Sequence, residues 1–294
     1  LQARALQRRR SQTIGLVLPT GGPSFPDPFF AEFLAGIGSE TARSGFDLLV
    51  STPSAELSEI DVYRRLVAGG RVDGVILMRS RIDDARIRFL VEQHFPFAVF
   101  GRTGLNESYT YIDIDGRAGQ AAMTAHLIEL GHRQIAYMTP PSTLMFARFR
   151  LEGFYEAMAQ NGVPVDERLI VECDLTENAG KRLALQLLKL DNPPTAIMTG
   201  NDLMAIGVMN AVREMGMRVG QDIAVGGFDD IPAAEHLNPG LTTIRQPIFQ
   251  IGQQLTRRLL QLIEGEVSGD QSTLLAPELI LRGSSNHRQQ GRPE

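Results

Sequence analysis

Short apolar runs alternate along the chain with longer segments in which apolar residues recur every three or four positions. The short runs predict buried strands, and the longer segments predict amphipathic helices. The predicted strands are residues 14–18, 47–50, 74–77, 97–100, 134–138, 196–198 and 223–226. The predicted helices are residues 29–44, 56–68, 83–93, 117–130, 147–161, 177–189, 202–215 and 249–264.

This alternation is typical of parallel sheets that are covered by helices on both faces. A single doubly wound sheet rarely needs so many units, so the pattern predicts an α/β protein with two doubly wound parallel-sheet lobes. An extended segment at residues 111–115 (YIDID) interrupts the alternation of strands and helices and marks the boundary between the two lobes. Two further extended segments, residues 241–247 and 273–284, indicate that the chain crosses between the lobes more than once.

The composition is that of a globular protein. The chain has 294 residues, of which 43% are hydrophobic, enough to fill two cores. No apolar run approaches the roughly 18–20 residues of a membrane helix, and the first run stops at Pro19, too early for a secretory signal. Cys173 is the single cysteine, which fits a reducing compartment. We therefore expect a cytoplasmic protein that contacts no membrane.

Motifs for nucleotide, metal and acyl-transfer chemistry are absent from the sequence. It contains no GxxxxGK[ST] loop, no GxGxxG turn, no HExxH helix and no GxSxG elbow. We therefore predict no cofactor, no metal site and no catalytic residues. A glycoside-processing enzyme that uses acids scattered in the sequence, Asp115, Asp229 and Asp230, stays open as an alternative.

Polar residues follow several of the predicted strands, at the edge where open α/β sheets bind ligands. Asn201 and Asp202 stand between a strand and a helix, in the sequence TGND, where either residue serves as a helix N-cap. An amide both donates and accepts hydrogen bonds, which suits a sugar hydroxyl. One residue of the pair can therefore bind a ligand while the other caps the helix.

The sequence GGFDD, residues 226–230, leaves the next strand in the same way. Its two glycines let the backbone pass close to another group, Phe228 offers an apolar face, and one carboxylate accepts hydrogen bonds from vicinal hydroxyls. The alternative is that both acids belong to turns and caps.

Cationic and aromatic residues near two predicted helix starts extend the candidate site. Arg150, in FARFRLEGF, lies where the helix dipole disfavours a cation, which indicates a partner, either an internal acid or a ligand. Phe29 and Phe30 follow Pro28 at another helix start. We expect one ring to belong to the core and assign the stacking role against a flat ligand face to Phe30.

Arginines crowd the start of a chain whose formal net charge is -5. The sequence LQARALQRRRSQ is typical of a solvated linker. It also suits a short helix whose exposed leucine enters a DNA minor groove beside the arginines.

Taken together, these segments resemble the LacI/GalR (lactose-repressor) family of bacterial transcription regulators over the whole chain. The likeness rests on ARALQRRRSQTIGLVLP, DPFFAEFLAGIGSETARSGFDLLV, IDIDGRAGQAAMTAHLIELGHRQIAYM, FARFRLEGF, PTAIMTGNDLMAIGVMNAVREMGMRVGQDIAVGGFDDIPAAEHLNPGLTTIRQP and LLAPELILRGS, which follow in the family's order. The resemblance implies a periplasmic-binding-protein-like (type I) core of two lobes joined by three crossovers, with a small-molecule effector between them.

The resemblance also implies which residues bind the effector. The family's effector-binding arginine, asparagine and aspartate fall on Arg150, Asn201 and Asp229, and the acid after the first crossover falls on Asp115. The aromatic residues of the motifs complete the set. The candidate ligand-binding residues are Arg150, Asn201, Asp229, Asp115, Phe30 and Phe228.

Residues 1–12 are similar to part of the family's hinge helix. The hinge leucine that enters the minor groove falls on Leu6, with Ala3 and Arg4 beside it. The family's helix-turn-helix module is expected to precede this hinge. We expect one lobe over residues 13–112 and 244–268, the other over residues 113–243 and 269–285, and a disordered tail over residues 286–294.

The resemblance implies a homodimeric repressor that senses a small sugar or related metabolite and binds operator DNA when its upstream module is present. An exported periplasmic sugar-binding protein of a transporter shares the core fold and stays open as the alternative.

Overall fold

The computed structural model describes residues 10–18, 27–53, 57–266 and 271–285, which form two compact units. Unit 1 comprises Leu1–Asp113 with Pro247–Leu274, and unit 2 comprises Ile114–Gln246 with Leu275–Glu294. The last passage of the chain between units falls at 274/275 rather than at the 268/269 expected from the sequence. The reason is local: Tyr111 N donates to Gln271 O (3.0 Å), which ties this segment into the sheet of unit 1.

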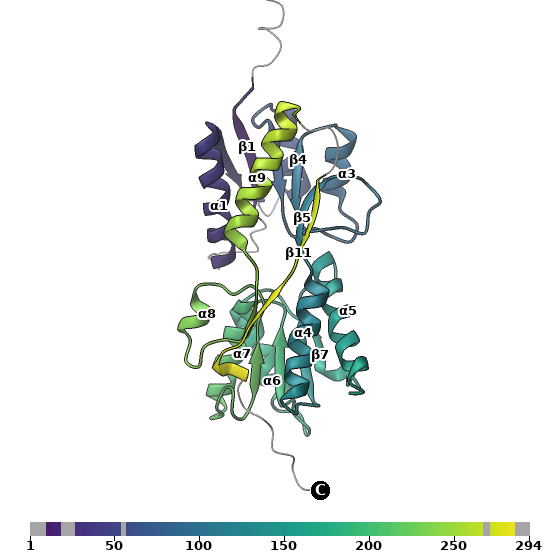
Figure 1. Cartoon of the computed structure of the whole chain (residues 1–294), viewed down its shortest axis with the longest axis vertical. Helices are drawn as coiled ribbons and strands as arrows, with labels where there is room; N and C mark the ends of the chain where they lie inside the picture. Colours follow the sequence, from purple (N-terminus) through teal and green to yellow (C-terminus); the bar gives the residue numbers. More distant parts are fainter. Residues whose placement is uncertain (1–9, 19–26, 54–56, 267–270, 286–294) are drawn as a thin grey trace, which may run out of the picture. The chain divides into compact units, whose positions relative to one another are not determined.

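Unit 1 contains, within its described residues, a six-stranded sheet in the order β11-β5-β4-β3-β1-β2. The strands are β1 (Thr13–Val17), β2 (Asp47–Ser51), β3 (Gly74–Leu77), β4 (Phe97–Phe100), β5 (Thr110–Ile114) and β11 (Ser272–Leu275). The pairs from β2 to β5 are parallel. Helices α1 (Pro28–Ser44) and α9 (Ile248–Glu264) lie side by side (Figure 1), and α2 (Glu59–Ala68) and α3 (Ala85–Glu92) pack on the other face.

The strand β3 shows how the sequence builds this core. All four of its residues, GVIL, are buried, as expected of a central parallel strand with helices on both faces. Val75 and Leu77 face the cluster formed by α2 and α3. Gly74 faces α9, where a Cβ would lie 2.8–2.9 Å from the side chains of Ile263 and Leu259.

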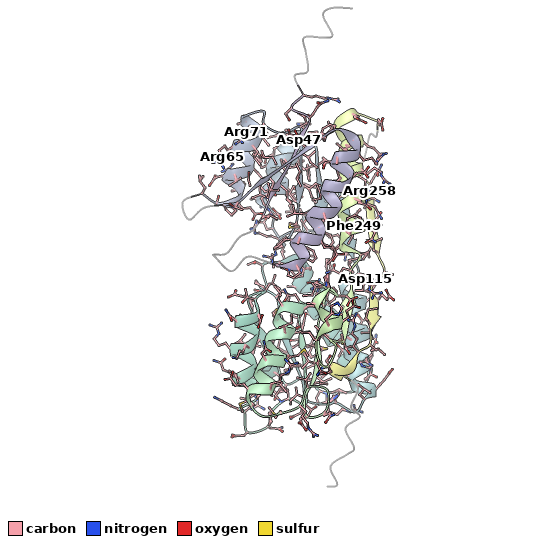
Figure 2. The ribbon with its side chains drawn as sticks, turned by 90° about the vertical axis from the view of Figure 1, so that its left-hand side faces the viewer. Asp47, Arg65, Arg71, Asp115, Phe249 and Arg258 are labelled. Carbon is pink, nitrogen blue, oxygen red and sulfur yellow. The ribbon has the colours of Figure 1, made fainter. Side chains whose placement is uncertain are left out.

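Glycines allow α1 and α9 to touch backbone to backbone. A Cβ at Gly36 would lie 2.1 Å from the carbonyl oxygen of Phe249, which is labelled in Figure 2. A Cβ at Gly252 would lie 2.6 Å from the carbonyl oxygen of Phe33. Real Cβ atoms do not approach oxygen so closely, so each glycine is required by the helix opposite.

We predict that Gly36→Ala destabilises the protein by about 1–3 kcal/mol, because the added methyl group must push α9 away. The matched control is Gly38→Ala on the same helix, where a Cβ would meet nothing within 4 Å. That change should stabilise by about 0.5–1 kcal/mol, since alanine favours helix. Urea unfolding followed by circular dichroism measures both, and equal effects at the two positions would contradict the close contact.

Unit 2 contains, within its described residues, a four-stranded parallel sheet in the order β7-β6-β8-β9. The strands are β6 (Ile135–Thr139), β7 (Ile170–Glu172), β8 (Ala196–Thr199) and β9 (Ala224–Gly226). Helices α4 (Gly116–Glu129) and α5 (Met145–Gln160) cover one face, and α6 (Glu177–Leu187) and α7 (Asp202–Glu214) cover the other. The unit also has α8 (Ala233–His236), the 3-10 helices η2 (Glu167–Leu169) and η3 (Gly283–Ser285), and antiparallel β10 (Thr243–Arg245) and β12 (Glu278–Ile280).

The terminal extended segment is split between the two units. The sequence predicts one strand region over residues 273–284, but the structure has β11 in the sheet of unit 1 and β12 paired with β10 in unit 2. Pro277, which has no N–H to donate to a ladder, separates the two strands. Arg258 of α9 (Figure 2) fixes β11 by donating to Gln271 O (3.1 Å) and Thr273 Oγ1 (2.7 Å).

The predicted fold class is confirmed, since both units are built on mostly parallel sheets flanked by helices. Residues 111–115, predicted to interrupt the alternation of strands and helices, belong largely to β5, a regular strand of unit 1. Strand β7 was not predicted, because three residues at a sheet edge are too few to show a period. None of the helices in the described part of the chain has the length and apolar character to cross a membrane.

Cys173 lies in the core of unit 2, against α6 and α7. Its side chain is buried, and burial raises the pKa of this thiol to about 12. The thiolate form is therefore scarce at neutral pH.

Candidate ligand-binding site

The polar residues singled out in unit 2 lie at one edge of its sheet. Strands β8 and β9 are parallel neighbours that end at Thr199 and Gly226. Asn201 and Asp229 follow them within three residues, so both stand at the carboxyl edge of the sheet. This is the edge at which open α/β sheets bind ligands.

Arg150 reaches the same edge from α5. The residue is only 6% exposed, and its guanidinium carbon lies 3.4 Å from the ring centroid of Phe228 and 4.7 Å from that of Phe146. Its Nη1 donates to the carbonyl oxygen of Gly200. The partners shown for this cation are thus aromatic faces and a carbonyl group, which hold the guanidinium beside Asn201.

The neighbouring Arg148 behaves differently. Its side chain is 57% exposed and forms an i,i+4 ion pair with Glu152 (3.0 Å) on the surface of α5. The two arginines of FARFR therefore have different roles, and Arg148 offers a matched control for Arg150.

Asn201 is the N-cap of α7. Its Oδ1 accepts from Met204 N (3.0 Å), and its Nδ2 donates to Leu175 O (3.4 Å). In the TGND pair, the capping role therefore belongs to Asn201, and Asp202 has another role.

Asp229 is held in an unusual backbone conformation, with φ of 128°. Its Oδ1 accepts from Gln246 Nε2 (2.6 Å), and its N–H donates to Ile244 O (2.8 Å). The carboxylate is 6% exposed and follows Phe228, whose ring is fully buried beneath Arg150. The structure thus brings Arg150, Phe228, Asn201 and Asp229 together.

Asp115 lies at the start of α4 (Figure 2) and is its N-cap, accepting from Ala118 N (3.0 Å). A Cβ at the next residue, Gly116, would lie 3.2 Å from Arg150 Cγ. The beginning of α4 therefore borders the arginine, although the Asp115 carboxylate itself is used by the cap.

Phe30 lies in unit 1, on α1, and is only 2% exposed. Its ring is covered by Arg79, whose guanidinium carbon lies 4.9 Å from the ring centroid and which also pairs with Asp27 (3.6 Å), the N-cap of α1. Of the two phenylalanines, Phe29 is the less buried, and it stacks on Phe100 at 5.9 Å. Arg79, at 27% exposed, is thus more accessible here than the Phe30 ring.

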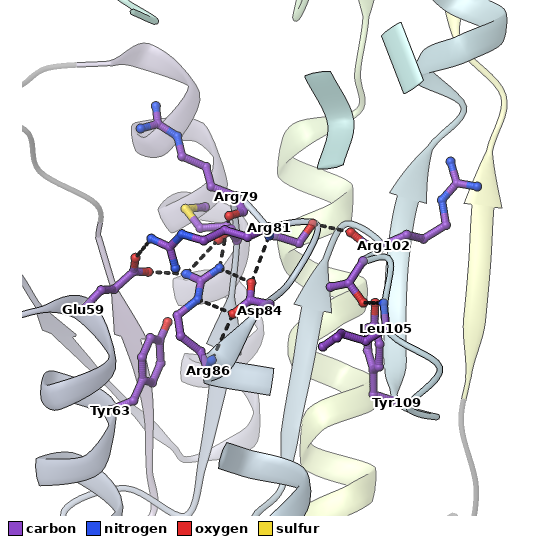
Figure 3. Close-up of polar contacts among 12 residues, drawn as sticks. Glu59, Tyr63, Arg79, Arg81, Asp84, Arg86, Arg102, Leu105 and Tyr109 are labelled. Carbon is purple, nitrogen blue, oxygen red and sulfur yellow. Dashed lines mark hydrogen bonds and ion pairs between the residues drawn. The ribbon is translucent and has the colours of Figure 1, made fainter. Parts of the chain in front are cut away.

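The loop that carries Arg79 is fixed by an ionic cluster (Figure 3). Arg86, 1% exposed, donates to both oxygens of Asp84 (2.9 and 2.6 Å) and pairs with Glu59. It also donates to Met78 O (3.2 Å) and Arg79 O (3.1 Å), which follow β3. Burial alone would raise the pKa of Asp84, but the hydrogen bond and charge of Arg86 outweigh it and hold that pKa below its ordinary value.

Asp202 is a fully buried carboxylate in this region. Its Oδ1 accepts from Thr243 Oγ1 (2.6 Å) and its Oδ2 from Ile231 N (2.9 Å). Burial raises the pKa of Asp202 to about 6, and the nearby charge of Asp230 adds to the rise, while these hydrogen bonds oppose it.

We predict that the stability of the wild type relative to Asp202→Asn depends on pH. Because the pKa of Asp202 rises from 3.8 to about 6 on folding, folding favours the protonated form. The resulting contribution to the free energy of unfolding, up to about 3 kcal/mol, is fully present below pH 3.8 and is lost as the pH rises through 6. Denaturation of both proteins between pH 4 and 7.5 measures the difference, and a difference independent of pH would contradict the raised pKa.

One residue of these sites escaped prediction, and another, at a strand exit that the sequence does indicate, has a conformation that it does not. Gln246 contacts Asp229, but its position in LTTIRQP gives no chemical sign of this, since only the fold brings β10 beside the GGFDD turn. Arg79 follows β3 with φ of 51°, a conformation that the residue type does not predict.

The hinge residues predicted to contact DNA, Ala3, Arg4 and Leu6, lie outside the described residues. In the part of the chain that the structure describes, no three His, Cys, Asp or Glu side chains are grouped to hold a metal ion.

Comparison with known proteins agrees with this architecture. A family model described as a periplasmic binding protein-like domain matches residues 124–285. Together with the two parallel-sheet units, this places the chain among the periplasmic-binding-protein-like cores.

The relatives are regulators of transcription. The HTH-type transcriptional regulator CelR of Thermobifida fusca is 33% identical over 96% of this chain and 84% of its own length. A LacI-family regulatory protein from Chloroflexus aggregans has a structure with a TM-score of 0.83 and 37% identity, covering 94% of this chain and 99% of its own. The chain belongs to the LacI family of transcriptional regulators, as its motifs predict.

Two other solved structures show family members with ligands. The complex of CelR with cellobiose has a TM-score of 0.86 and 32% identity, covering 95% of this chain and 86% of that one. The lac repressor dimer bound to operator and an anti-inducer has a TM-score of 0.80 and 29% identity, covering 97% of each chain. Both are regulators, which favours this function over that of an exported transporter component.

Proposed function

We propose that this chain is the effector-binding and dimerisation core of a cytoplasmic repressor whose effector is a small sugar or related metabolite. The observation that carries the proposal is the placement of Arg150, stacked on Phe228 and bonded to Gly200 O, beside Asn201 and Asp229. This group combines cationic, amide and carboxylate functions at one sheet edge. Such groups provide both donors and acceptors for sugar hydroxyls.

The proposed roles of the residues follow from their contacts. Arg150 donates charge-assisted hydrogen bonds, Asn201 uses its amide, and Asp229 accepts from vicinal hydroxyls. Asp115 borders the site from α4. In unit 1, Phe30 acts through Arg79, which covers its ring and presents the accessible polar group.

A catalytic role for the acids receives no support from their contacts. Asp115 caps α4, Asp229 bonds to Gln246, and Asp230 pairs with Arg245 and Arg282, each at 2.7 Å. The contacts of the three acids are thus a helix cap, a side-chain hydrogen bond and two ion pairs, and none of these marks a proton donor. We therefore propose a binding protein without catalytic residues.

The test of effector binding is a thermal-shift screen of the chain against monosaccharides and disaccharides, with cellobiose included because CelR binds it. We expect at least one sugar to raise the melting temperature in a saturable way, since a ligand that binds the folded state stabilises it. Calorimetry then gives the affinity and stoichiometry. A panel that produces neither a thermal shift nor heat would contradict the sugar assignment.

The proposed partners are a second copy of the chain and operator DNA, as in the lac repressor structure. Sedimentation velocity of the chain should show a dimer. Fluorescence anisotropy on protein extended upstream to a helix-turn-helix module should show sequence-dependent DNA binding that the sugar alters, because an effector shifts the balance between conformations. DNA binding that depends neither on the DNA sequence nor on the sugar would exclude a function as a repressor.

A further inference from the structure

Two consecutive acids of the GGFDD sequence have left-handed backbone conformations. Asp229 has φ of 128° and Asp230 has φ of 58°. Residues with a Cβ disfavour this region, so such a turn persists only where surrounding bonds hold it. We call residues 229–230 the Asp–Asp turn.

Asp202 bonds to both chain segments that border this turn. Its Oδ2 accepts from Ile231 N (2.9 Å), the first N–H after the turn, and its Oδ1 accepts from Thr243 Oγ1 (2.6 Å) on β10. Strand β10 meets the turn directly, because Asp229 N donates to Ile244 O (2.8 Å). One buried carboxylate therefore fixes the exit of the turn and the strand on which the turn rests.

The carboxylate of Asp202 also explains why position 227 requires glycine. A Cβ there would lie 2.2 Å from Asp202 Oδ1. The group that the backbone passes closely, which the sequence leaves open, is thus the carboxylate of Asp202.

The other charges of this region have separate partners. Asp230, the acid whose charge acts on Asp202, is paired with Arg245 and Arg282. Asp229 accepts from Gln246. The helix cap is supplied by Asn201 through Met204 N. Asp202 is therefore not needed as the cap of α7, and its contacts lead to the turn.

We propose that Asp202 is a positioning residue of the effector site, which holds the Asp–Asp turn in its left-handed conformation and thereby aims the carboxylate of Asp229. The assignment of Asp229 to the effector rests on the proposed function, whereas the control of the turn by Asp202 does not. Asp202 itself is fully buried, so its proposed role is to position Asp229 rather than to contact the ligand.

The test compares Asp202→Ala with Asp202→Asn by amide hydrogen exchange of the ligand-free chain. The amides of Asp229 and Gln246 report the turn, because they donate to Ile244 O (2.8 Å) and Asp229 O (3.2 Å). In Asp202→Ala we expect exchange at both to accelerate about tenfold or more, because the carboxylate that holds the turn is lost. Asp202→Asn should rescue the turn to within about twofold of the wild type, since its amide oxygen accepts from Ile231 N and its NH₂ group donates to Thr243 Oγ1.

A matched control is Thr176→Ala, which removes the side-chain cap of α6, the helix packed against α7. It should accelerate exchange at the start of α6 and leave the Asp–Asp turn unchanged. If Asp202→Ala does not fold, Thr243→Val removes one of the two bonds alone and should still accelerate the Asp229 amide.

Unchanged exchange of the turn in Asp202→Ala, or in Thr243→Val where the alanine variant is unfolded, would overturn the proposal. So would failure of Asp202→Asn to rescue a folded Asp202→Ala, because asparagine keeps the volume of the side chain and can make both hydrogen bonds. These outcomes are independent of any sugar. A chain that binds no sugar but loosens its turn in Asp202→Ala would refute the proposed function and leave the role of Asp202 intact.

Discussion

Arg86→Ala should lower the free energy of unfolding by about 3–5 kcal/mol, the cost of breaking a buried ion pair from one side. The side chain is 1% exposed and serves the carboxylates of Asp84 and Glu59 together with two backbone carbonyl groups. Its removal leaves Asp84, which is fully buried, without its cation. Urea unfolding followed by far-ultraviolet circular dichroism measures the loss.

The control is Arg88→Ala on the same helix, whose partner Asp83 is 68% exposed. That change should cost less than about 1 kcal/mol. The loss in Arg86→Ala should also shrink as the pH falls below 3.8, because Arg86 holds the pKa of Asp84 below that value and the stabilisation this gives disappears on protonation. Equal losses in the two variants would show that the cluster in Figure 3 contributes little to stability.

Arg150→Ala should weaken binding of the effector by about 2–5 kcal/mol, or roughly 30-fold to several thousandfold in Kd. The guanidinium is fixed between Phe146 and Phe228 before the ligand arrives, so its hydrogen bonds cost little ordering entropy. Calorimetry with the sugar identified by thermal shift gives the change. Asp229→Ala should show a loss in the same range.

Arg148→Ala separates this effect from a general change in charge. Arg148 lies two residues away on α5 but points to the surface, where it pairs with Glu152. Its removal should leave Kd within about twofold of the wild type. If Arg150→Ala and Asp229→Ala both fold and both retain wild-type affinity, neither residue belongs to the site.

The sequence predicts the parallel sheets well because their strands are buried on both faces. GVIL of β3 is apolar throughout, and a run of that kind bounded by turns has few alternatives. Short elements such as β7 escape prediction because their pairing depends on neighbours distant in the chain.

The candidate site is predicted less completely, since the type of a residue does not reveal where its side chain points. TGND indicates that one residue caps the helix while the other can bind a ligand, but in the structure Asn201, the ligand candidate, is the cap and Asp202 is fully buried. Phe30 is predicted as a stacking face, yet Arg79 covers it from a loop that no periodicity predicts.

The buried thiol of Cys173 makes the chain a convenient host for probes. Because this single cysteine is 3% exposed and its pKa is raised to about 12, maleimide reagents at neutral pH should leave the native protein unlabelled. Two cysteines introduced at exposed positions, one in each unit, would then be the sites of attachment for a pair of fluorophores. Energy transfer between them would report whether a bound sugar changes the distance between the units, and the native cysteine would not have to be replaced first.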